Sequence, residues 1–173
     1  MERDEIKNYL RQLSNILKRK NIRGELGIVG GAAMCLAFKA RASTKDVDGV
    51  FEPSSEVRLA AKEVAEENSL SDDWLNDAAK AFMVPVPKKR ILFEFDHLLV
   101  WTPEADYLLA MKTISARWDT SDRDDVIFLI SFLGLRSPEK VYQVIQEYYP
   151  KARIPAKTQF FIDEIFEKAL VDG

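Results

Sequence analysis

Apolar residues recur at helical spacing in the first segment of the chain and gather in short runs after it. Ile6, Leu10, Leu13 and Leu17 lie one helical turn apart, so residues 3–20 are predicted to form a charged amphipathic helix. Short apolar runs bounded by turn residues predict strands over 26–29, 47–51, 91–95 and 98–101. Further helices are predicted over 32–40 and from Ser54 to about Glu67, and a helix cap at 71–73, before Trp74.

Beyond Trp101 the pattern is helical throughout. Start signals stand at Thr102-Pro103-Glu104, Ser121–Asp124, Ser137-Pro138-Glu139 and Pro155. The first helix is expected to reach about Trp118 and the third about Tyr148. Residues 126–132 are apolar nearly all round, which predicts a buried second helix, and Phe161, Ile165 and Ala169 line one stripe of the last. We therefore predict an α+β fold, in which a small mixed β-sheet domain with flanking helices (residues 1–101) carries a C-terminal helical bundle (residues 102–173) packed on it.

Composition narrows the class of protein. The chain has 173 residues, 47% of them hydrophobic and 31% charged, with a net charge of −3, so no domain-wide basic field favours non-specific nucleic-acid binding. One cysteine (Cys35) and one histidine (His97) exclude a disulfide framework and a Cys/His zinc site, and both are expected to pack rather than react. No secretory signal or membrane-spanning apolar run is present, which predicts a cytoplasmic protein without a membrane partner.

Asp46 and Asp48 are the most informative residues. Side chains alternate along a strand, so both carboxylates are expected on one face, where they repel unless a cation neutralises them. Magnesium is commonly held by one or two carboxylates together with substrate phosphates. A strand, the pair Gly30-Gly31 and a helix precede these acids, so backbone amides could contact a phosphate close to the metal. This pattern favours phosphoryl or nucleotidyl transfer over two solvated aspartates at a strand end. Taken alone, Gly30-Gly31 is as readily a simple tight turn.

Three stretches resemble known proteins. The run from Val29 to Ala33, followed by Arg41-x-Ser43-Thr44-x-Asp46-Val47-Asp48, resembles the polymerase-β-type nucleotidyltransferase superfamily. The stretch from Pro103 to Lys112, with Ala116-Arg117 and Asp122–Asp125, is similar to bacterial nucleotidyltransferase-like proteins related to the abortive-infection (AbiEii-type) toxins. Within that group, the run Asp73-Trp74-Leu75-Asn76-Asp77 resembles a small uncharacterised family. The resemblance spans roughly residues 25 to 150.

The resemblance implies a site. Asp46 and Asp48 would hold Mg²⁺ in a two-metal centre, and Gly30, Gly31, Arg41 and Thr44 would bind the nucleotide. Arg41 could instead brace Asp46. The superfamily's third carboxylate lies on a neighbouring strand, and the candidates here are Glu94 and Asp96, with Asp77 an outside one. We expect Glu94 or Asp96 within roughly 6 Å of Asp46 or Asp48, as two metals about 4 Å apart require. The alternative for both is a surface acid.

Lys112 stands on an apolar helix face, where its ammonium needs an anion. The resemblance implies the triphosphate, and a structural carboxylate such as Asp125 is the alternative.

These expectations combine into Mg²⁺-dependent transfer of a nucleoside monophosphate from a nucleoside triphosphate to an acceptor hydroxyl, with release of pyrophosphate. RNA, a protein and a small molecule all remain as acceptors, and the related toxins suggest a cognate antitoxin protein as a partner. The first alternative is a catalytically degenerate module that binds a nucleotide or a partner. The second is a metal-dependent phosphohydrolase, which the lack of His-Asp clustering disfavours.

Overall fold

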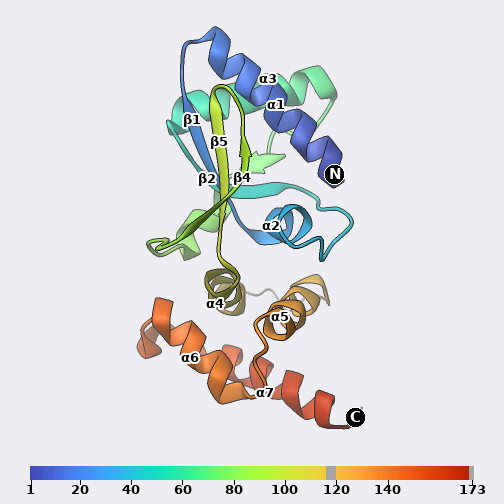
Figure 1. Ribbon diagram of the computed structural model, residues 1–173, viewed down its shortest axis with the longest axis vertical. Coiled ribbons are helices and arrows are strands. Elements are labelled where there is room, and N and C mark those ends of the chain that lie inside the picture. The colour runs from blue at the N-terminus through green and yellow to red at the C-terminus, as the bar shows by residue number, and fades with distance from the viewer. Residues whose placement is uncertain (116–119, 172–173) are drawn as a thin grey trace. The chain divides into compact units, whose positions relative to one another are not determined.

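The structure is a computed structural model that describes residues 1–115 and 120–171 (Figure 1). It divides into two compact units. Unit 1 comprises Met1–Ala81 and Pro87–Pro103, and unit 2 comprises Phe82–Val86 and Glu104–Gly173. Among the described residues, no helix combines the length and the hydropathy that crossing a bilayer requires.

Unit 1 is built on a mixed sheet. Its strands are β1 (Gly24–Ile28), β2 (Val47–Glu52), β3 (Leu75–Asn76), β4 (Lys89–Glu94) and β5 (Leu98–Pro103), in the spatial order β3-β2-β1-β5-β4. β1 pairs antiparallel with β2 and parallel with β5, and β4 closes the far edge antiparallel to β5. This sheet, together with the helices of both units, confirms the predicted α+β fold class.

One face of the sheet carries the core of unit 1. Helix α1 (Arg3–Arg19) packs against helix α3 (Ser54–Asn68) and against β5, and α3 packs on β2 (Figure 1). The predicted stripe Ile6, Leu10, Leu13 and Leu17 is fully buried there. On the other face β2 carries Asp48, Val50 and Glu52, none of them buried. Because residues of one strand alternate between faces, this second face is the one available for chemistry.

Unit 2 contains helices from the C-terminal part of the chain. They are α4 (Ala105–Ser115), α5 (Thr120–Phe132), α6 (Pro138–Tyr148) and α7 (Ala156–Val171), with the 3-10 turn η2 (Lys151–Arg153). A second 3-10 turn, η1 (Ala78–Phe82), belongs to unit 1 except for Phe82. The short segment Phe82–Val86, which we call the strap, joins these helices although it precedes β4 in the chain. The Tyr107 hydroxyl accepts a hydrogen bond from the Val84 amide (3.0 Å) and donates one to the Val84 carbonyl (2.7 Å). The Tyr149 hydroxyl donates to the Phe82 carbonyl (2.6 Å).

Several predicted boundaries differ from the structure. Thr102 and Pro103 continue β5 instead of capping a helix, because Arg90 and Lys89 pair with them across the β4–β5 ladder, and α4 begins at Ala105. The helix predicted over 32–40 is α2 (Gly30–Leu36). The residues after the predicted cap at 71–73 form β3, since the Val47 amide donates to the Trp74 carbonyl (2.7 Å) and extends the sheet.

Helix α5 is less buried than predicted. Phe132 is 58% exposed and Ile127 39%, so an apolar composition did not guarantee a covered helix. In α7 the predicted stripe is buried at Phe161 and Ile165, while the side chain of Ala169 lies outside the described residues. The same holds for the predicted end of α4 at Trp118 and for the Ala116-Arg117 pair.

Candidate functional site

The turn after β1 is built around two glycines that other side chains approach closely. Gly30 has φ +63°, a left-handed conformation that favours glycine, and a Cβ placed on it would lie 2.9 Å from Asp48 Oδ2. A Cβ on Gly31 would lie 2.8 Å from Thr44 Oγ1 and 3.3 Å from Arg41 Nη1. Larger residues at either position would displace these groups. Asp48, Thr44 and Arg41 therefore converge on the Gly30-Gly31 turn.

The two aspartates stand at the start of β2. Asp48 lies inside the strand, and its carbonyl accepts a hydrogen bond from the Val29 amide (2.9 Å), which ties the turn to β2. Asp46 lies just before the strand, and its carbonyl accepts a bond from Thr44 Oγ1 (3.1 Å). Val47, between them, is fully buried. The alternation of the strand thus turns Asp48 away from the core, whereas Asp46 precedes the strand and is half-buried.

The carboxylates of Asp46 and Asp48 can supply part of the ligand set of a magnesium ion. Two carboxylates beside a glycine turn match the usual Mg²⁺ environment, in which phosphate oxygens and water supply the remaining ligands. Asp46 and Asp48 would hold such an ion. Across residues 1–115 and 120–171, however, no three His, Cys, Asp or Glu side chains group closely enough to hold a metal by themselves.

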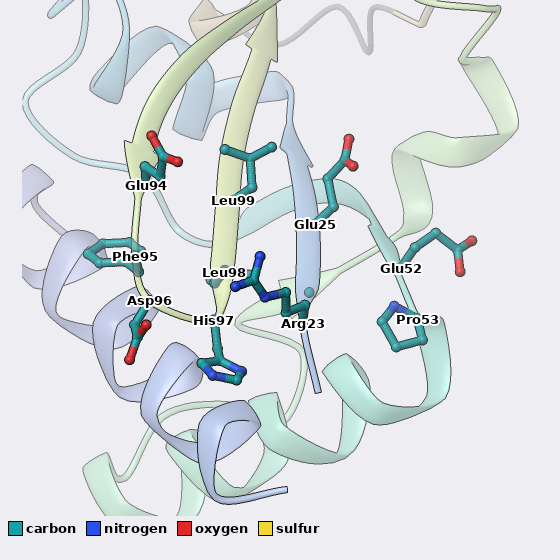
Figure 2. A pocket seen from close by; sticks show the side chains of 11 residues that line it. Arg23, Glu25, Glu52, Pro53, Glu94, Phe95, Asp96, His97, Leu98 and Leu99 are labelled. Carbon is teal, nitrogen blue, oxygen red and sulfur yellow. The ribbon is translucent and has the colours of Figure 1, made fainter. Parts of the chain in front are cut away.

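The strand order separates Glu94 from the aspartates. Glu94 is in register with Leu99 of β5, Leu99 with Glu25 of β1, and Glu25 with Glu52 of β2. Figure 2 shows Glu94, Leu99 and Glu25 side by side on adjacent strands. Three strand spacings amount to roughly 14 Å, and Asp48 lies four residues before Glu52, about 13 Å further along the strand. Glu94 therefore cannot share a metal with Asp48, and the expected separation of roughly 6 Å is wrong for it.

Asp96 is also placed elsewhere. It follows β4 in the turn to β5, and its carboxylate forms an ion pair with Lys18 Nζ of α1 (2.5 Å). The hydrogen bond from Lys18 lowers the pKa of this exposed carboxyl. Together with Glu94 it lines a shallow pocket of about 790 Å³, whose other lining residues include Arg23, Glu52 and His97 (Figure 2). Asp77, the outside candidate, pairs with Arg58 (2.9 Å). The surface-acid alternative thus holds for these carboxylates.

An indole occupies the sheet face beside the glycine turn. Trp101 of β5 pairs with Gly27 of β1, and a Cβ on Gly27 would overlap its ring. Trp101 Nε1 donates to Glu25 Oε1 (2.7 Å), and Lys89 Nζ binds the same oxygen (2.6 Å) and lies 4.5 Å from the ring centroid. The hydrogen bond from Lys89 is the main reason that the pKa of Glu25 is lowered. Sequence reasoning missed this cluster, although a glycine inside an apolar strand signals a close approach.

Lys112 finds its anion within unit 2. Its ammonium lies 2.6 Å from Asp125 Oδ2 and 3.1 Å from Asp122 Oδ1. Lys112 is 6% exposed and Asp125 2%, so this is a buried ion pair. The structural alternative named for Lys112 is the one that the structure shows, and we no longer include this residue in the nucleotide site. Cys35 is buried, as expected. Trp74 is buried too, and its Nε1 donates to the Ala61 carbonyl (2.9 Å).

Comparison with known proteins bears on this site. Over residues 5–145 the chain matches the family described as "Nucleotidyltransferase of unknown function (DUF6036)". No curated protein and no solved structure matches the chain. The matched range includes the glycine turn, both aspartates and the Lys112 ion pair.

Proposed function

Since this chain belongs to that family of nucleotidyltransferases, we propose that it binds a nucleoside triphosphate together with Mg²⁺ at the Gly30–Asp48 site. One observation carries the proposal: Arg41, Thr44 and Asp48 converge on a turn in which any residue other than glycine would collide with them. A turn of this kind leaves the backbone open to a close-lying ligand.

The chemistry of each group supports this assignment. Backbone amides at Gly30 and Gly31 and the guanidinium of Arg41 would contact phosphate oxygens. The Thr44 hydroxyl, bonded to the Asp46 carbonyl, would fix the loop beside them. Asp46 and Asp48 would hold the magnesium, which would neutralise charge on the triphosphate and orient it.

We rank nucleotide binding above nucleotidyl transfer. Two carboxylates suffice to hold a Mg²⁺–nucleotide complex, but they do not complete the two-metal site that transfer needs. Transfer to an acceptor hydroxyl is accelerated most when two metals stabilise both the attacking and the leaving oxygen. Among the described residues no third acid groups with the aspartates at the turn, and on the same face of the sheet the Trp101 ring lies over Gly27. The function supported best is thus that of a nucleotide-binding family member with weak or no transferase activity. Family membership favours the second candidate, Mg²⁺-dependent transfer of a nucleoside monophosphate, with RNA, protein or a small molecule as acceptor. A cognate antitoxin partner rests on resemblance alone.

Thermal unfolding with each nucleoside triphosphate, with and without Mg²⁺, tests the binding. Saturating ligand at about a hundred times the dissociation constant should stabilise the protein by about 2.7 kcal/mol. Asp46→Asn with Asp48→Asn should abolish this increment while the unliganded protein still melts cooperatively. An equal increment in the double variant would rule the site out.

Two glycine variants distinguish the effect of filling the turn with a side chain from the effect of backbone strain alone. Gly30→Ala should abolish nucleotide binding, because its Cβ would displace the Asp48 carboxylate. Gly134→Ala is the matched control: Gly134 has φ +65°, and nothing lies within 4 Å of the added Cβ. It should cost about 1 kcal/mol of stability and leave binding unchanged. If both variants bind like the wild type, the turn is not a phosphate site.

Transfer is tested separately. The protein, Mg²⁺ and each α-³²P-labelled nucleoside triphosphate are incubated with cell extract, and label on macromolecules and pyrophosphate release are measured. We expect binding without label transfer. Transfer that is lost in the Asp46→Asn, Asp48→Asn variant would establish the second candidate instead.

A further inference from the structure

The loop that brings Arg41 and Thr44 to Gly31 has little internal structure of its own. Between α2 and β2 it is held to α2 by the Ala40 amide, which donates to the Met34 carbonyl (3.0 Å), and by a weak bond from Cys35 Sγ to the Ala42 carbonyl (3.7 Å). The other side of the loop faces the beginning of the chain.

There the first two residues pair with the loop as a short strand would. The Met1 nitrogen donates to the Thr44 carbonyl (2.6 Å), and the Thr44 amide donates to the Met1 carbonyl (2.9 Å). Glu2 and Ser43 form an antiparallel bridge. Both backbone groups of Thr44 are therefore bonded to one residue, while its hydroxyl lies where a Gly31 side chain would be.

Helix α1 in turn holds these two residues. The Ile6 amide donates to the Glu2 carbonyl (3.0 Å), and the Glu2 amide donates to Glu5 Oε2 (2.7 Å) at the start of the helix. Ile6 is fully buried in the core of unit 1. A continuous set of contacts thus runs from the core, through α1, Glu2 and Met1, to Thr44 and the glycine turn.

We propose that Met1 and Glu2 are positioning residues of the nucleotide site, acting through backbone pairing with Ser43 and Thr44. The inference rests on the proposed function, because it concerns the affinity of that same site. Met1 and Glu2 need not touch the ligand. They fix where Thr44 and Arg41 stand beside Gly31, and supporting contacts of this kind commonly change ligand affinity by about 10–100-fold.

Deleting Glu2 and Arg3 removes the bridge and leaves the helix from Asp4 onward. We expect the dissociation constant for the Mg²⁺–nucleotide complex to rise by about tenfold or more, with a similar melting temperature of the unliganded protein. The matched control, Arg3→Ala, keeps Met1, Glu2 and their backbone pairing and should bind within about twofold of the wild type. Hydrogen exchange at the Thr44 amide should accelerate in the deletion variant and not in the control.

A second variant covers the case in which the deletion unfolds the protein. One glycine inserted between Glu2 and Arg3 shifts the pairing by one residue and leaves α1 intact, so it should weaken binding in the same direction. Unchanged affinity in the deletion or the insertion variant, with Asp46 and Asp48 still required for binding, would overturn this inference and leave the proposed function standing. Absence of Mg²⁺–nucleotide binding by the wild type would overturn both.

Discussion

At the scale of single residues, the buried ion pair of Lys112 and Asp125 carries a large desolvation cost. Lys112 and Asp125 are both more than nine-tenths buried, and Asp122 adds a second carboxylate to the same ammonium. Removing two ions from water costs several kcal/mol each, and only close pairing offsets that cost. The pair belongs to the helical unit, where it joins α4 to α5.

Lys112→Met should destabilise the protein by about 3–5 kcal/mol, because it removes the cation that neutralises buried Asp125. Lys18→Met is the matched control, since it breaks the Lys18–Asp96 pair, whose partners are both largely exposed. That change should cost less than about 1 kcal/mol. Urea unfolding of the two variants measures the difference, and equal losses would contradict a buried pair.

Residue by residue, the sequence was informative where the chemistry is local. Gly30, Gly31, Arg41, Thr44 and Asp48 lie within one strand–turn–helix–strand stretch, so their convergence follows from short-range geometry. Glu94 depended on which strands are neighbours, and spacing along a chain does not state that order. Lys112 is intermediate between local and long-range prediction. Its apolar surroundings predicted that the ammonium pairs with an anion, and only the fold could show which anion that is.

At the scale of elements, two buried threonines differ in whether their hydroxyls form hydrogen bonds. Thr158 of α7 is 1% exposed, and its hydroxyl donates to the Thr113 carbonyl of α4 (3.0 Å). Thr102 of β5 is fully buried, and within the described part of the chain its hydroxyl has no hydrogen-bond partner. A buried threonine hydroxyl therefore stabilises the contact between α7 and α4, whereas the unbonded hydroxyl of Thr102 lowers stability.

Replacement by the isosteric valine should have opposite effects at the two positions. Thr158→Val should destabilise the protein by about 1–2 kcal/mol, because the interhelical hydrogen bond is lost. Thr102→Val should be neutral or stabilising by up to about 1 kcal/mol, since it removes a buried polar group without a partner. Thermal unfolding of both variants provides the measurement. A loss at Thr102 as large as that at Thr158 would mean that its hydroxyl is satisfied after all.

Helices were predicted correctly where hydrophobic periodicity and capping residues agreed. The predictions failed where pairing with a neighbouring strand determined the local structure. The α1 stripe and the start of α6 after Ser137 follow the local pattern. Thr102-Pro103-Glu104 carries an equally good start signal, yet pairing with β4 keeps Thr102 and Pro103 in the sheet. β3 is only two residues long, and an element this short has no periodicity to detect.

At the scale of the whole molecule, the two units do not correspond to two continuous stretches of chain. The strap Phe82–Val86 lies between η1 and β4 in sequence and belongs with the C-terminal helices. Two tyrosines from α4 and from the end of α6 hold its backbone. Burial raises the pKa of the Tyr107 hydroxyl, so it stays protonated and able to donate at neutral pH.

Tyr107→Phe should loosen the strap without unfolding the protein. The change removes both bonds to Val84, so the Val84 amide should exchange with solvent about tenfold faster, as a loss of about 1.4 kcal/mol in local stability implies. Tyr142→Phe is the control, because Tyr142 donates to Asp163 within the same unit and touches no strap residue among the described contacts. Equal protection of Val84 in wild type and Tyr107→Phe, measured by hydrogen–deuterium exchange, would contradict the assigned role of Tyr107.

The position of the strap in the sequence decides which fragments of the chain keep its contacts. A gene truncated after Trp101 would encode a polypeptide in which Phe82–Val86 had lost the tyrosines that bind it, leaving an apolar, proline-containing stretch exposed to proteases and to aggregation. Conversely, a fragment of residues 102–173 alone would lack the backbone groups of Phe82 and Val84 with which the hydroxyls of Tyr107 and Tyr149 form hydrogen bonds. An excised helical unit is therefore complete only if it keeps residues 82–86 from the sequence between the strands.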